Sequence, residues 1–119
     1  MSIMSLTATG ADSIADQLPK GLLDRIVAHL NPQKVILFGS RATAEVHDDS
    51  DWDFLVIVDD DILPERIGWR SMYEARRGIR SPIDLIPCRA STFRDRADIV
   101  GSLPWTAATK GTVVYERAD

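Results

Sequence analysis

The sequence predicts an α/β (α+β) fold, a mixed β-sheet flanked by helices, from three short apolar runs and the segments between them. Residues 35–38, 54–58 and 83–86 are rich in β-branched and aromatic side chains, which favours buried strands over helices. Residues 41–50 are polar and too few for a parallel crossover, so the first two strands are expected to be antiparallel. Residues 59–82 suffice for a helical crossover, so the third strand is expected to lie parallel to the second.

The composition describes one globular domain in a reducing environment. The chain has 119 residues, of which 45% are hydrophobic and 27% are charged, as in ordinary globular proteins. The formal net charge of −4 argues against direct nucleic-acid binding, which usually needs a basic surface. A single cysteine, Cys88, excludes an internal disulfide, and no apolar run reaches the roughly 18 residues of a membrane span. Because no signal peptide is seen either, we expect a cytoplasmic protein.

Two helices are expected around the second strand. The first begins at Pro19, has one apolar face and stops at Asn31-Pro32. The second covers residues 64–77, is capped by Asp59-Asp60-Asp61 and ends at Gly78. These aspartates could instead be extra metal ligands, but they follow the far end of the second strand, which favours the cap.

The rest of the chain completes a single domain. The further elements expected are a strand bounded by Pro82 and Pro87, a charged helix over 92–99, a helical segment from Leu103 to Gly111 and a last strand over 112–115. Residues 18–119 are expected to form the domain, and residues 1–17 a partly flexible N-terminal arm. Arg66, Arg70 and Arg77 could approach a triphosphate or an acidic partner, but a solvent-facing stripe is the simpler interpretation.

Acidic residues gather where two of the expected strands begin. Asp51 and Asp53 share one face of the second strand and Trp52 faces the opposite way, because side chains alternate along a strand. Both faces are apolar beyond Asp53, so only the first residues of this strand can reach water. Asp84 stands near the start of the parallel third strand and should reach the same rim. Gly39 follows the first strand, whose end lies beside this rim in an antiparallel pair.

Three converging carboxylates predict a magnesium site. They repel one another unless a cation lies between them, and Mg²⁺ takes hard oxygen ligands while keeping positions open for phosphate. Two such ions can stabilise both the attacking and the leaving oxygen of a displacement at phosphorus. Asp51 and Asp53 would hold the ions, and Asp84 would complete the second site and orient or deprotonate the attacking hydroxyl. The phosphate contacts predicted at the turn are backbone amides at Gly39, the hydroxyl of Ser40 and the start of a short helix at Arg41.

These motifs together resemble a known superfamily. Asp-x-Asp or Gly-Ser alone is a weak signal, and the turn is not a Walker A loop. The segments Leu37-Phe38-Gly39-Ser40-Arg41-Ala42 and Ser50-Asp51-Trp52-Asp53-Phe54-Leu55-Val56 resemble the polymerase-β-like nucleotidyltransferases, specifically the minimal nucleotidyltransferases (MNT). The resemblance covers nearly the whole chain. It implies the polymerase-β-like nucleotidyltransferase fold and Mg²⁺-dependent transfer of a nucleoside monophosphate from a nucleoside triphosphate.

The resemblance also assigns roles. Gly39, Ser40 and Arg41 take the triphosphate role, and Asp51, Asp53 and Asp84 form the acidic triad. Two departures lie beside the site. Ala44 stands where a glycine is frequent, and Trp52 is larger than the usual residue between the two aspartates.

The acceptor of the transferred nucleotide is expected to be a protein. Larger relatives carry a second domain that binds the acceptor, and this chain has no room for one, so an oligomer mate or another protein must bind it. Small members of the family resemble the antitoxin of HEPN/MNT toxin–antitoxin pairs, in some of which the transferase adenylylates the toxin. We therefore expect an ATP-using enzyme that modifies a HEPN partner. The alternatives are a non-catalytic module that neutralises the HEPN ribonuclease sterically and, ranked lower, modification of a small molecule.

Overall fold

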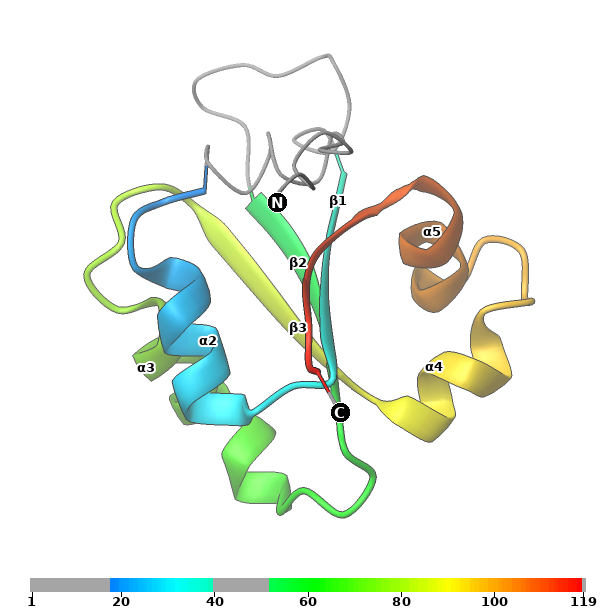
Figure 1. Cartoon of the computed structure of the whole chain (residues 1–119), viewed down its shortest axis with the longest axis horizontal. Coiled ribbons are helices and arrows are strands. Elements are labelled where there is room, and N and C mark those ends of the chain that lie inside the picture. The colour runs from blue at the N-terminus through cyan, green and yellow to red at the C-terminus, as the bar shows by residue number, and fades with distance from the viewer. Residues whose placement is uncertain (1–17, 40–51, 119) are drawn as a thin grey trace, which may run out of the picture.

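The computed structural model describes residues 18–39 and 52–118, arranged as one sheet with helices on both faces (Figure 1). The expected arm, residues 1–17, lies outside the described residues. The elements in chain order are α2 (Leu22–Leu30), β1 (Lys34–Phe38), β2 (Trp52–Val58), η3 (Pro64–Ile67), α3 (Trp69–Arg76), β3 (Ile83–Arg89), α4 (Ala90–Arg96), α5 (Leu103–Lys110) and β4 (Thr112–Glu116).

The sheet is mixed, as predicted, with the strand order β3-β2-β1-β4. The pair β1–β2 is antiparallel and the pair β2–β3 is parallel, which confirms both expectations drawn from connection length. β4 pairs antiparallel with the other side of β1, with a register irregularity between Val35 and Ile36. β2 is therefore a central strand, and its apolar run on both faces follows from that place.

Helices cover the two faces of the sheet in pairs. α2 and α3 lie on one side and α4 and α5 on the other (Figure 1). Phe54 and Val56 of β2 pack into the core under α2 and α3, whereas Leu55 and Ile57 pack with Ala107 of α5 on the other face. The strict alternation along β2 thus builds two cores from one strand. The part of the chain described here has no helix with the length and apolarity needed to cross a membrane.

The first predicted helix starts later than expected. α2 begins at Leu22, after a turn in which the Leu22 amide donates to the Pro19 carbonyl at 3.1 Å. Gly21 precedes the helix with a φ of 80°, which is left-handed, so Pro19 cannot be in the helix. The predicted stop is confirmed, because Asn31 takes a left-handed conformation and its amide donates to Val27.

The predicted helix over 64–77 is two pieces, and its predicted cap is wrong. Gly68 is extended and separates the 3-10 helix η3 from α3, which ends at Arg76. The residue before η3 is Leu63, with no side-chain cap. Asp60 instead accepts a hydrogen bond from the Ser91 amide at the start of α4, at 2.8 Å. Asp59 and Asp60 therefore bind groups that are distant in sequence.

Two further boundaries differ from the prediction. β3 continues through Pro87 to Arg89, because it is an edge strand and can accommodate a proline. α4 covers Ala90–Arg96 rather than residues 92–99. The end of the chain follows the prediction, with α5 stopped at Gly111 and β4 directly after it.

Candidate active site

The register of the parallel pair brings two of the predicted carboxylates side by side. Asp53, the second residue of β2, is the partner of Asp84, the second residue of β3. Paired residues of adjacent strands share a face and lie about 5 Å apart. Asp53 is half-buried and Asp84 is exposed. The two side chains therefore lie on one face at the same end of the sheet, which is where the sequence predicts Asp84 beside Asp53.

Gly39 packs directly against the carboxylate of Asp53. Phe38 is the antiparallel partner of Asp53, so the residue after it stands at the same rim. A Cβ atom at Gly39 would lie 2.5 Å from Oδ2 of Asp53, and its φ of +83° is left-handed. Only glycine satisfies both conditions without strain. The local backbone thus sets the position of the carboxylate, and Gly39, Asp53 and Asp84 come together.

The other predicted site residues lie outside the described residues. These are Ser40, Arg41 and Asp51. The phosphate cradle and the third carboxylate therefore stay predictions. Within 18–39 and 52–118 no group of three or more metal-ligating side chains is found.

The electrostatics at this rim favour a bound cation. Asp53 and Asp84 are partners on adjacent strands, so their like charges repel each other. Asp84 makes no ion pair with any described residue. Carboxylate oxygens at an open strand end are the hard ligands that Mg²⁺ prefers. The residues that are described therefore fit a magnesium site.

Trp52 does not line this site. Its side chain is only 4% exposed and belongs to the core under α2 and α3, on the face opposite Asp53. Its ring stacks on that of Phe54, with centroids 6.3 Å apart. The larger side chain thus serves packing, and the carboxylate face beside it is unaffected.

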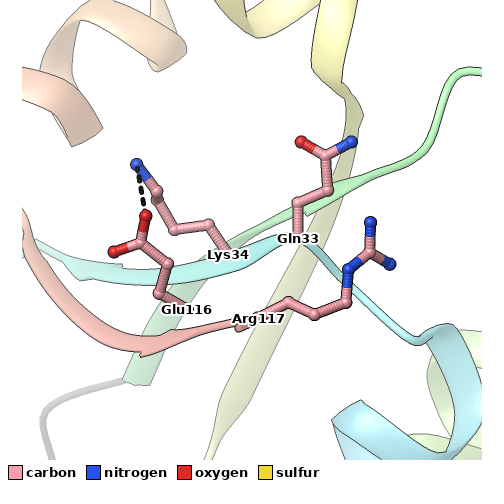
Figure 2. Close-up of a pocket in the computed structure, with 4 residues that line it drawn as sticks. All are labelled: Gln33, Lys34, Glu116 and Arg117. Carbon is pink, nitrogen blue, oxygen red and sulfur yellow. Dashed lines mark ion pairs between the residues drawn. The ribbon is translucent and has the colours of Figure 1, made fainter. Parts of the chain in front are cut away.

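A second polar region lies at the opposite end of the sheet. Gln33, Lys34, Glu116 and Arg117 line a pocket of about 410 Å³ where β1 begins and β4 ends (Figure 2). Its charges are compensated within the chain: Lys34 Nζ is 3.8 Å from Glu116 Oε2, and Arg117 Nη2 is 2.9 Å from Asp59 Oδ1.

Asp59 is held ionised at this end. Hydrogen bonds from Arg117 and then Gln33 lower the pKa of its carboxyl below the ordinary value, against a smaller opposing effect of desolvation. Sequence reasoning missed this pair, whose members are 58 positions apart. The sequence does show that Asp59 and Arg117 each directly follow a strand. This indicates that they are neighbours only when the strand order is known.

Cys88 is a packing residue of β3. It lies against the core on the α4 and α5 face, and burial raises the pKa of its thiol while the charge of Arg96 acts in the other direction. The thiol is therefore protonated at neutral pH and is a poor nucleophile.

Comparison with known proteins identifies the domain. The family model "Polymerase beta, Nucleotidyltransferase" matches residues 22–119. No curated protein matches the chain significantly. One similar solved structure is described as a toxin-antitoxin with AMP-PNP. It has 19% identity and a TM-score of 0.56, over 84% of this chain and 75% of that one.

A second solved structure agrees with the first. It is described as a mutant of the toxin-antitoxin MntA-HpeT in which two aspartates are changed to glutamate. It has 17% identity and a TM-score of 0.55, again over 84% of this chain and 75% of that one. At these identities the likeness concerns the fold. Since the family match covers most of the chain and includes both Asp53 and Asp84, this protein belongs to the polymerase beta nucleotidyltransferase family.

Proposed function

We propose that this chain is a Mg²⁺-dependent nucleotidyltransferase that transfers AMP from ATP to a hydroxyl group of a partner protein, a HEPN toxin for which it is the antitoxin. The observation that carries the proposal is the pairing of Asp53 with Asp84 at the open end of β2 and β3, beside the glycine that packs on Asp53. Adjacent carboxylates supply the hard oxygen ligands that Mg²⁺ prefers.

Each residue has a distinct part in the proposed transfer. Asp51, Asp53 and Asp84 would hold Mg²⁺, which supplies positive charge to the phosphates and the leaving group. Asp84 is exposed and can orient the acceptor hydroxyl and take its proton. The hydroxyl oxygen then bonds to the α-phosphorus, the bond from that phosphorus to the bridging oxygen breaks, and pyrophosphate leaves. Gly39 lets the backbone approach Asp53 closely, where the side chain of a larger residue would displace the carboxylate.

The solved neighbours support the finer parts of the proposal. The first contains AMP-PNP, an adenine nucleotide, in a toxin-antitoxin assembly. In the second, the two aspartates changed to glutamate are separated by a single position, the spacing of Asp51 and Asp53. The HEPN identity of the partner is supported by the resemblance of the Gly39 and Asp53 motifs to minimal nucleotidyltransferases.

The experiment that tests this proposal measures transfer of labelled AMP to the partner, and not only the toxicity of the partner. The full chain is incubated with ATP labelled at the α-phosphate, Mg²⁺ and the purified HEPN partner, and label on the partner is measured. Asp53→Asn should reduce transfer by about a thousandfold, which corresponds to about 4 kcal/mol of transition-state stabilisation. Asp95→Asn, an exposed aspartate on α4, is the matched control and should leave transfer unchanged.

The second candidate function predicts a different result. If the chain is a non-catalytic module, wild type transfers no label and Asp53→Asn neutralises the toxin as well as wild type does. Binding of the partner by calorimetry, measured for both proteins, separates a lost reaction from a lost complex.

A further inference from the structure

The outer face of α3 exposes large apolar side chains. Trp69 is 76% exposed and Tyr73 is 45% exposed, and Leu63, just before η3, is 57% exposed. The opposite side of the helix is buried through Met72 and Ala75, which anchor it to the core under α2. Because α3 is already packed on one side, the exposure of its aromatic rings does not come from a loose helix. Aromatic surface left in water at this scale is typical of an interaction site.

Arginines are interleaved with these rings. The guanidinium of Arg70 lies 5.2 Å from the centroid of the Trp69 ring, and that of Arg76 lies 5.4 Å from the centroid of Tyr73. Residues 64–80 contain five arginines and two glutamates, a net charge of +3, in a chain whose net charge is −4. The rest of the chain therefore carries −7. The excess positive charge is therefore concentrated in residues 64–80.

We propose that this α3 face, made of Trp69, Arg70, Tyr73 and Arg76, docks an acidic surface of the partner protein. Trp, Tyr and Arg are the residues that most often dominate binding energy at protein interfaces. The rings would enter an apolar pocket of the partner, and the guanidinium groups would meet its carboxylates. The inference rests on the proposed function only for the identity of that partner.

Charge argues against two other occupants. A symmetric contact with a second copy would set one arginine-rich face against the same face, and like charges would repel. A nucleic acid is a long polyanion and would extend beyond the basic helix. The rest of the chain is acidic overall and would repel it, which weakens binding. An acidic protein patch of limited size fits both the charge and the extent of the face.

The α3 face belongs to the return from β2 to β3, on the side of the sheet opposite Asp53. β2 ends at Val58 and β3 starts at Ile83 beside Trp52, so the segment between them must return along the sheet to the rim. α3 is the helix of that return. The amide of Trp52 donates to the Pro82 carbonyl at 3.0 Å, which joins the end of the return to the start of β2. The end of that return leads to the rim, whereas α3 itself packs with Trp52 on the face of the sheet opposite Asp53.

The test measures affinity of the full chain for the purified partner by calorimetry. Trp69→Ala should raise Kd about thirtyfold, as expected for an aromatic hot spot. The double variant Arg70→Glu with Arg76→Glu should raise it by at least about tenfold, and wild-type affinity should fall as salt is added. Val100→Ala and Arg94→Glu are the controls, since Val100 is 77% exposed and Arg94 is an exposed arginine on α4. Both should stay within about twofold of wild type.

The outcomes separate this surface from the enzyme activity. Loss of affinity in the α3 variants without any label transfer by wild type supports the surface and contradicts the proposed reaction. Wild-type affinity in the α3 variants overturns the surface, whether or not label is transferred. So does the absence of any partner binding by wild type. Two results would reassign the face instead: self-association in sedimentation that Trp69→Ala abolishes, or tighter binding of single-stranded RNA than of the partner.

Discussion

The two ends of β2 each carry aspartate in opposite electrostatic settings. Asp59, just past the far end, accepts hydrogen bonds from Arg117 and Gln33, and these partners tie the ends of three strands together. At the near end, Asp53 stands beside Asp84, a second carboxylate that has no ion pair among the described residues. At one end the aspartate has its countercharge in Arg117, and at the other end two aspartates stand on adjacent strands.

This difference teaches how to separate a structural carboxylate from one kept for a ligand. A carboxylate that stabilises the fold has its countercharge built into the chain, and its pKa is lowered, as at Asp59. Two carboxylates on adjacent strands repel each other, and a bound cation would compensate that repulsion. The four predictions below test this difference between the two ends, in order of decreasing effect.

The largest effect is expected on catalysis at the near end. Asp84→Asn should lower label transfer by about a thousandfold, because in the proposed reaction Asp84 is both a metal ligand and the group that takes the hydroxyl proton. Asp59→Asn should change transfer by no more than about twofold beyond its effect on folding. Single-turnover rates of the two variants provide the comparison. Equal losses of transfer in Asp84→Asn and Asp59→Asn would show that the two ends of β2 do not differ in this respect.

The next effect concerns the glycine against Asp53. Gly39→Ala should destabilise the fold by about 2 kcal/mol, since it combines left-handed strain with a Cβ 2.5 Å from the carboxylate. It should also lower transfer, because the carboxylate must move. Gly101→Ala is the matched control: its φ is +89° but nothing lies within 4 Å of the new Cβ. Urea unfolding of that control should show the strain alone, with transfer unchanged. Equal loss of transfer in both would point to strain rather than displacement.

A smaller effect is expected at the far end. Asp59→Asn should lower the free energy of unfolding by about 1 kcal/mol at neutral pH, a value limited by solvent because the side chain is 39% exposed. The folded-state pKa of Asp59 is lowered, so its contribution is present above the unfolded pKa and is lost as the pH falls through the folded pKa. Wild type and variant should therefore converge below about pH 4. A constant gap down to pH 2 would contradict this origin.

The smallest effect has the opposite sign. Without divalent ions, Asp84→Asn should stabilise the fold by about 0.5 kcal/mol, because it relieves repulsion with Asp53. Added Mg²⁺ should stabilise wild type and leave this variant nearly unchanged. Thermal unfolding with and without Mg²⁺ measures both. Destabilisation of the metal-free chain by Asp84→Asn would show that the carboxylate has a structural countercharge after all.

Sequence reasoning succeeded where the signal is local or depends on connection length. The alternation in β2 predicts both of its faces, and the short and long connections predict the antiparallel and parallel pairings. From these alone, Asp84 is placed beside Asp53. The family match then agrees with the resemblance of the motifs.

It failed where the deciding partner is distant in the chain. Asp59 and Asp60 look like a helix cap beside Pro64, but Arg117 and the amide of Ser91 bind them instead. Strand order is equally hidden, so the continuation of β3 through Pro87 was not predictable from the proline alone. The split at Gly68 shows that one extended glycine can divide an otherwise periodic helix.

The proline within β3 has a consequence for self-assembly. β3 is the outermost strand on its side of the sheet, and Pro87 offers no amide hydrogen there. An incoming strand from another copy would meet a gap in its hydrogen-bond ladder, and prolines on edge strands are one of the ways in which proteins discourage such pairing. Copies of this chain are thereby hindered from stacking edge to edge into fibres along β3.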